Sequence, residues 1–241
     1  MMLMVWLLFG FQDENWKIDR VEWTDVVPNG SLFQLENPYG DIRIRGTANP
    51  ELALSAVIQF ADGDPEKIEI KREQKDGVFQ VSAYFAGDQA KTFAKGGRRR
   101  ADITIFLPYG TPIVAATGAG LLEAKGLKSD STFQTFSGKV FYKGQGKLVV
   151  ETYQGEIQAF FERVSASADF TTKLGTIALH FPRKAEMSVA VRTMGEVTSD
   201  YSMTMDVSDS GVRQAQVKVG AGTHQLTVES ASGNVKLLER R

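Results

Sequence analysis

Two groups of acidic side chains could do the chemistry that cuts glycosidic bonds. Glu151 and Glu156 lie five residues apart, and Asp200, Asp206 and Asp209 share the segment SDYSMTMDVSDSG. Glycoside hydrolysis needs two carboxyl groups about 5 to 9.5 Å apart. Each of these residues has the spacing of an outward strand position or a turn position. Solvated surface is therefore the favoured interpretation of both groups.

Histidine, serine and cysteine give no catalytic motif. His180 and His224 lie 44 residues apart without an HExxH motif, and the alternation in IALHFP predicts that His180 faces solvent from a strand. No G-x-S-x-G motif marks a serine nucleophile, and the chain has no cysteine. We therefore expect neither a metal nor a cofactor, and we predict that the protein is not an enzyme.

The strongest local charge is a basic cluster at Arg98, Arg99 and Arg100, which follows two lysines in a glycine-containing segment. Such a cluster could bind an anionic glycan, a lipid phosphate or an acidic protein. The favoured interpretation is a solvated loop ahead of a strand at 102–107. The chain as a whole carries a net charge of −1, so its overall field predicts no nucleic-acid partner.

The elements that must position these residues are strands, because period-two alternation runs along the chain and helical periodicity is scarce. Up to Pro108, runs such as ELALSAVIQF and GVFQVSAYF are separated by turn residues and predict antiparallel hairpins. Beyond Pro108, glycines recur at intervals of 18, 17, 20, 20 and 38 residues, each two residues before an aliphatic side chain. We interpret the last interval as two periods around a degenerate unit near Gly211. The recurring glycines are Gly120, Gly138, Gly155, Gly175, Gly195 and Gly233.

A period near 20 residues predicts an all-β fold of the β-solenoid or parallel β-helix-like type, in which each coil buries its apolar residues against its neighbours. Glycine at each corner would allow a positive φ or a close backbone approach. A meander of antiparallel hairpins, in a sandwich or a barrel, is the alternative. Two turns per coil would give the spacing of hairpins, so the sequence leaves both architectures open.

Stacked coils would align equivalent residues about 4.8 Å apart. The inward column would contain Val140, Ile157, Ile177 and Val197, and the outward column Lys139, Glu156, Thr176 and Glu196. This register sets Lys139 beside Glu156 as an ion pair. Thr152 is expected in an outward polar column.

Exposed groups beside the corners are the candidate binding residues. Aromatic side chains there could pack on sugars or on neighbouring chains, or could cover the glycine corners. The aromatic residues expected at the corners are Phe136, Tyr142 and Tyr153. The candidate binding residues are Tyr153, Lys139, Glu156, Glu196 and the basic cluster.

The segment ADITIFLPYGTPIVAATGAGLLEAKGL and the later units FQTFSGKV, VETYQGEI and FTTKLGTI resemble a bacterial putative-adhesin family of unknown function, related to the head domains of auto-transporter adhesins. The resemblance extends over about 33–238. It implies a strand ending in I-x-L/V-P-x-G, repeated S/T-x-x-G-x-I/V coils and a cell-envelope or exported protein without established chemistry. The unit at Gly195 departs from the pattern because Arg192 occupies the Ser/Thr position.

The chain begins with an apolar run, Met2–Phe9, which is too short for a bilayer span of about 20 residues. It has the length of the apolar part of a secretory signal, although no Lys or Arg precedes Lys17. A buried first strand and a start codon placed too late are the alternatives. We expect a signal at 1–11 and one all-β domain at 16–241, with a hairpin-rich part at 16–108 and a repeat part at 109–241.

Together these features predict a non-enzymatic protein exported to the periplasm, the cell surface or the medium. Its rigid β face would bind a protein or a glycan of the cell envelope. A polysaccharide-acting enzyme on a β-helix scaffold is the alternative function. A sensory or scaffold role in an envelope-stress pathway is implied by the resemblance alone.

Overall fold

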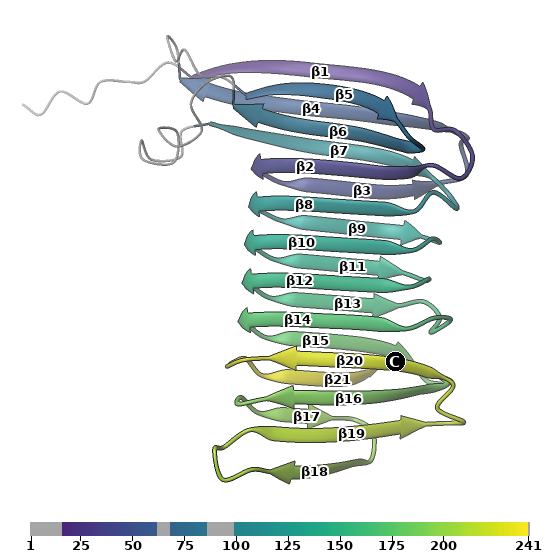
Figure 1. Ribbon diagram of the computed structural model, residues 1–241, viewed down its shortest axis with the longest axis vertical. Coiled ribbons are helices and arrows are strands. Elements are labelled where there is room, and N and C mark those ends of the chain that lie inside the picture. Colours follow the sequence, from purple (N-terminus) through teal and green to yellow (C-terminus); the bar gives the residue numbers. More distant parts are fainter. Residues whose placement is uncertain (1–15, 62–67, 86–98, 241) are drawn as a thin grey trace, which may run out of the picture.

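The computed structural model describes residues 16–61, 68–85 and 99–240, and these residues form 21 strands in two large sheets (Figure 1). The predicted all-β class is confirmed. The expected signal at 1–11 and Arg98 lie outside the described residues.

Each sheet contains a long parallel ladder; antiparallel strands flank it at one end in sheet A and at both ends in sheet B. Sheet A has ten strands, in the spatial order β1 (Trp16–Val26), β4 (Glu51–Ala61), β7 (Arg100–Pro108), β3 (Ile42–Thr47), β9 (Leu122–Leu127), β11 (Val140–Gly144), β13 (Ile157–Phe161), β15 (Ile177–Pro182), β21 (Val235–Arg240) and β17 (Val197–Ser199). Sheet B has eleven, in the order β18 (Met203–Val207), β19 (Arg213–Val219), β16 (Met187–Thr193), β20 (His224–Ser230), β14 (Ala168–Leu174), β12 (Leu148–Gln154), β10 (Ser131–Ser137), β8 (Ile113–Ala119), β2 (Leu32–Tyr39), β6 (Val78–Phe85) and β5 (Ile68–Lys75).

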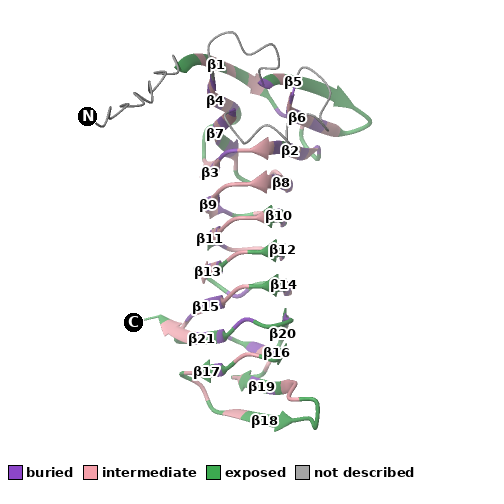
Figure 2. Ribbon diagram, turned by 90° about the vertical axis from the view of Figure 1, so that its left-hand side faces the viewer, coloured by how far each residue is buried: buried purple, intermediate pink, exposed green. Residues whose placement is uncertain are grey.

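Within the repeat, the chain alternates between the two sheets and stacks each pair of strands on the preceding pair (Figures 1 and 2). Val140 pairs with Ile157, and Ile157 with Ile177, in parallel ladders. All three side chains are fully buried. The predicted inward column is therefore confirmed for these residues. The alternative of antiparallel hairpins is wrong for 113–182, where the sheet pairings are parallel.

The amino-terminal part is less hairpin-like than the sequence predicted. Strands β2 and β6 pair in parallel with each other, as do β3 and β7, so both pairs join the stack. Antiparallel pairing is confined to β1 with β4, β4 with β7, and β5 with β6. Two adjacent runs of alternation cannot reveal whether they pair with each other or with distant strands, because both arrangements satisfy the same period.

The carboxyl-terminal end departs from chain order. Val197 does not stack on Ile177, because Val235 of β21 lies between them and pairs with both. The chain moves on to β16 and β17, turns back through the antiparallel pair β18 and β19, and returns to fill the intervening position with β20 and β21. The expected degenerate coil near Gly211 is instead the turn between β18 and β19, closed by a hydrogen bond from the Ser208 amide to the Val212 carbonyl.

The corners of the stack explain the recurring glycines. A Cβ atom on Gly155 would lie 1.7 Å from the carbonyl oxygen of Gly138, and one on Gly138 would lie 1.9 Å from that of Gly120. Only a residue without a side chain can fit at this distance. We call this set the glycine column; in stacking order it contains Gly40, Gly120, Gly138, Gly155, Gly175, Gly233 and Gly195.

A column of small polar side chains faces inward three residues before these glycines, or two residues before in the case of Thr193 and Gly195. Thr152 is only 5% exposed, so its predicted outward position is wrong. Alternation along β12 places Leu148, Val150 and Thr152 on the same inner face. Tyr142 is also buried rather than exposed, and its ring lies 6.1 Å from that of Phe133 between the sheets. Burial raises the pKa of the Tyr142 hydroxyl.

Candidate binding groove on the outer face of sheet B

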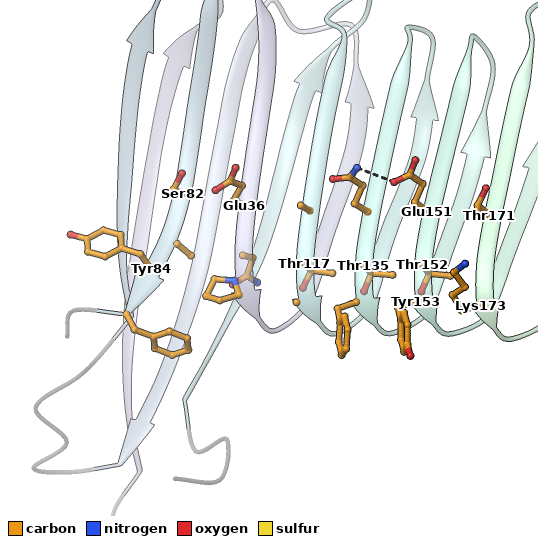
Figure 3. A pocket seen from close by; sticks show the side chains of 18 residues that line it. Glu36, Ser82, Tyr84, Thr117, Thr135, Glu151, Thr152, Tyr153, Thr171 and Lys173 are labelled. Atoms are coloured by element: carbon orange, nitrogen blue, oxygen red, sulfur yellow. Dashed lines mark hydrogen bonds between the residues drawn. The ribbon is translucent and has the colours of Figure 1, made fainter. Parts of the chain in front are cut away.

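Two exposed aromatic rings lie side by side on the outer face of sheet B. Phe136 on β10 and Tyr153 on β12 are 65% and 51% exposed, and their rings stack with centroids 5.0 Å apart and planes 4° apart (Figure 3). They meet because Thr135 pairs with Thr152 in the parallel ladder, which places the next residue of each strand side by side. The two rings form one wall of a hollow.

Small residues form the floor of this hollow, and Tyr84 on β6 stands on its far side (Figure 3). Outward positions on β8 are occupied by Ala116 and Gly118, next to Pro38 of β2. Gly118 cannot carry a side chain without a backbone shift, because its Cβ would lie 2.4 Å from the Pro38 carbonyl oxygen. The result is a hollow of about 700 Å³, which we call the sheet B groove.

Polar groups line the groove beside the rings. Gln134 donates a hydrogen bond from Nε2 to Glu151 Oε2 at 3.1 Å, and Lys173 extends the lining onto β14. At the far side the Tyr84 hydroxyl donates to the Glu69 carboxylate, and this hydrogen bond raises the pKa of Tyr84. Ring faces with hydrogen-bonding groups beside them are the usual contact surface for a polar partner that has an apolar face.

The backbones of the two glutamates in the groove are farther apart than the carboxyl groups that hydrolyse a glycoside. Glu36 aligns with Ala116, Ala116 with Gln134, and Gln134 with Glu151. Three strand spacings of about 4.8 Å separate the two backbones by roughly 14 Å. This exceeds the separation of about 5 to 9.5 Å that the reaction needs. The pair that the sequence suggested is also divided, because Glu151 lines the groove and Glu156 lies at a corner.

The predicted ion pair of the corner is confirmed. Lys139 Nζ lies 3.1 Å from Glu156 Oε2, and both side chains are more than 40% exposed. Glu196 does not extend this pair, because Thr176 and Asn234 occupy the two intervening corners. The Glu196 amide donates to Asn234 Oδ1 at 2.9 Å. None of the three charged residues lines the groove.

The basic cluster is partly built into the sheet. Arg99 is only 9% exposed, and Arg100 begins β7 rather than lying in a loop. The Arg100 guanidinium lies 2.6 Å from Asp102 and 3.2 Å from Asp41. The hydrogen bond to Asp102 raises the pKa of Arg100. Its charge is therefore already neutralised by Asp102 on the same strand and by Asp41, which precedes β3.

Histidine lies away from the groove. His180 faces outward on β15 while Ile177 and Leu179 are buried, as the alternation predicted, and its ring stacks on Phe160 at 4.0 Å. Burial lowers the pKa of His180, against an opposing effect of the Asp200 charge. Within the described residues, no group of three or more His, Asp or Glu side chains could hold a metal ion.

Sequence reasoning found one wall of the groove and missed the rest. Phe136 and Tyr153 could be recognised because they lie beside the glycine corners of the repeat. Tyr84, Pro38 and Gly118 come from strands that meet only through the parallel pairings of β2 with β6 and β8. The pairing of β2 with β8 joins segments on either side of 86–98, and no local sequence pattern predicts either pairing.

A family model described as Toastrack DUF4097 matches residues 29–238 of the chain. The chain belongs to this family. In this chain, the stacked strands of sheets A and B form the Toastrack domain. No curated protein matches the sequence.

Two solved structures are similar to the Toastrack domain at low sequence identity. One is a putative cell adhesion protein from Clostridium sporogenes, 15% identical, with a TM-score of 0.45 over 92% of this chain and 100% of the other. The second is a putative adhesin from Bacteroides fragilis, 10% identical, with a TM-score of 0.35 over 92% of this chain and 97% of the other. In the described residues, no helix has the length and hydropathy needed to cross a membrane.

Proposed function

We propose that this Toastrack protein is a non-enzymatic binding protein of the cell envelope, and that the sheet B groove holds its partner. The stacked aromatic wall of Phe136 and Tyr153 carries the proposal, because both residues are more than half exposed and lie side by side on neighbouring strands. Exposed aromatic surface of this kind is typical of contact sites rather than of a solvated face.

The parallel ladders support a rigid scaffold for this role. Both neighbours of β10 and of β12 are paired strands, so the groove floor has no free sheet edge. We interpret the stack as a two-sided β-solenoid with coils of about 20 residues, open at both ends. A ligand would meet a preformed surface and would lose little free energy to ordering the protein.

A glycan of the envelope fits the groove better than an extended peptide. The amide and carbonyl groups of the groove strands are used in the ladders, so a peptide could not bind there by adding a strand. A sugar ring needs only an apolar ring face and hydrogen-bonding groups at its rim, which Tyr153, Gln134 and Glu151 supply. Catalysis is disfavoured because the backbones of Glu36 and Glu151 are roughly 14 Å apart.

Retention on isolated bacterial cell-wall material tests the proposal. The wild-type protein should be retained, and the double variant Phe136→Ala, Tyr153→Ala should lose about 90% of the retained fraction, since hot-spot aromatics each contribute about 1 to 2 kcal/mol. The control is Met205→Ala, Val207→Ala, which removes two exposed apolar side chains of β18 outside the groove. Equal retention of the wild type and the aromatic double variant would reject the groove as the site.

A further inference from the structure

Figure 2 shows sheets A and B on opposite sides of the stack. The outer face of sheet A carries a second hollow. We call it the sheet A hollow; its volume is about 570 Å³. Four strands contribute to it, namely β9, β11, β13 and β21. Its lining residues are Lys125, Phe141, Lys143, Phe160 and Arg240.

Every charged side chain that lines the sheet A hollow is a cation. Lys125 Nζ lies 2.6 Å from the Glu123 carboxylate, which also binds the Arg45 guanidinium. Lys143 and Arg240 form no ion pair with any residue that the structure describes. Two positive charges thus remain available for a ligand.

Arg240 is held in place over the sheet. It aligns with Pro182 of β15, and its Nη1 donates to the carbonyl oxygen of Phe161 on β13 at 3.1 Å. The side chain therefore crosses β15 towards the cations on β9 and β11. The hydrogen bond uses one nitrogen of the guanidinium, and the other donors have no partner among the described residues, so they can bind an anion.

Aromatic rings lie between these cations. The Phe141 and Phe160 rings have centroids 5.3 Å apart, and Lys125 Nζ lies 5.0 Å from the centroid of the Phe141 ring. Phe160 in turn stacks on His180. The hollow therefore combines apolar ring faces with positive charge on both sides of them.

We propose that the sheet A hollow binds an acidic polysaccharide, whose sugar rings lie on Phe141 and Phe160 and whose carboxylate or sulfate groups pair with Lys143 and Arg240. An acidic peptide fits less well. Strands β11 and β13 are paired on both sides, so their amide and carbonyl groups cannot hold an extended peptide backbone.

Titration calorimetry with oligogalacturonate at low ionic strength tests the proposal. The double variant Lys143→Gln, Arg240→Gln should bind about tenfold more weakly, as expected from losing two partly exposed charge pairs. The matched control is Lys147→Gln, Lys218→Gln, which removes the same charge from exposed positions outside the hollow and should bind as the wild type does. Circular dichroism should show the same fold for all three proteins.

The alternatives give different results. No binding by the wild type, or equal loss in the control, would overturn the site. Tighter binding of poly-glutamate than of oligogalacturonate would assign the hollow to acidic polypeptides instead. Loss of oligogalacturonate binding in Phe136→Ala, Tyr153→Ala would move the anionic glycan to the sheet B groove. Retention on cell-wall material measures the groove separately, so either proposal can fail alone.

Discussion

The glycine column and the sheet B groove lie within a few residues of each other on the same strands, and opposite constraints shape them. At Gly155 the neighbouring carbonyl oxygen leaves no room for a side chain, and the same contact recurs from coil to coil. Two residues earlier, Tyr153 projects outward, where the repeat imposes no residue type. The repeat therefore fixes the residues that stacking requires, such as the corner glycines. Residues that bind a partner are expected at outward positions, where the residue type does not repeat.

Among the substitutions considered, Gly155→Ala should cause the largest loss of stability. The new Cβ would lie 1.7 Å from a backbone oxygen, so the stack must move, and we expect a loss of about 4 kcal/mol or more in the free energy of unfolding. Gly30→Ala is the matched control, because Gly30 has a φ of +80° and no atom near the added Cβ. It should lose only about 1 to 2 kcal/mol from backbone strain. Urea denaturation measures both, and similar losses would contradict the steric role of the column.

Two substitutions in the inner polar column should change the stability of the protein in opposite directions. Thr193 Oγ1 donates to the Gly233 carbonyl at 2.7 Å and accepts from the Gly195 amide at 2.9 Å. Thr193→Val should therefore cost about 1 to 3 kcal/mol, because it leaves both groups unpaired.

The hydroxyl of Thr152 is buried without a hydrogen-bond partner among the described residues. Thr152→Val should accordingly stabilise the protein by about 1 kcal/mol, since a valine does not have to desolvate a hydroxyl group. Thermal unfolding of the two variants provides the measurement. The same sign of change for both would show that the inner polar column is not controlled by hydrogen bonding.

A smaller effect is expected at the exposed corner. Lys139 and Glu156 are both more than 40% exposed, so a double-mutant cycle with Lys139→Ala and Glu156→Ala should give a coupling of about 0.5 kcal/mol. The coupling should decrease as salt is added. A coupling above about 2 kcal/mol would mean that this corner contributes to stability as strongly as the interior.

The smallest expected effect concerns pH. The folded-state pKa of His180 is lowered from 6.5 chiefly by burial, so the unfolded state binds its proton first as the pH falls. The contribution of the neutral ring is present above about pH 6.5 and is lost as the pH falls through the folded pKa. Denaturation at pH 7 and pH 5 should show a larger loss for the wild type than for His180→Gln. An equal loss in both proteins would remove His180 as the cause.

The features that could be predicted from the sequence are those that recur with the period of about 20 residues. The buried partners Val140, Ile157 and Ile177 and the pair of Lys139 with Glu156 follow from counting along successive units. The prediction that Thr152 faces outward was wrong. Thr152 is separated from Leu148 and Val150 by even numbers of residues, and this spacing places all three on the same face of the strand.

The order of the coils and most of the groove could not be predicted in this way. The units at Gly195 and Gly233 both place a glycine two residues before a valine, so this spacing is satisfied whichever of them stacks on Gly175. The groove floor depends on β6, β2 and β8 meeting in parallel, and these strands are far apart in the chain. Such choices are made by tertiary packing, which a local period does not encode.

Site-specific photo-crosslinking tests directly whether the sheet B groove is the binding surface. A photoreactive benzoylphenylalanine would replace Tyr153 in the groove in one protein and Val207 on β18 in another, and both would be irradiated on isolated cell-wall material. If the groove binds the partner, covalent adducts of one discrete class should form at position 153 and none at position 207. Adducts at position 207 alone, or equal yields at the two positions, would contradict the groove as the binding surface.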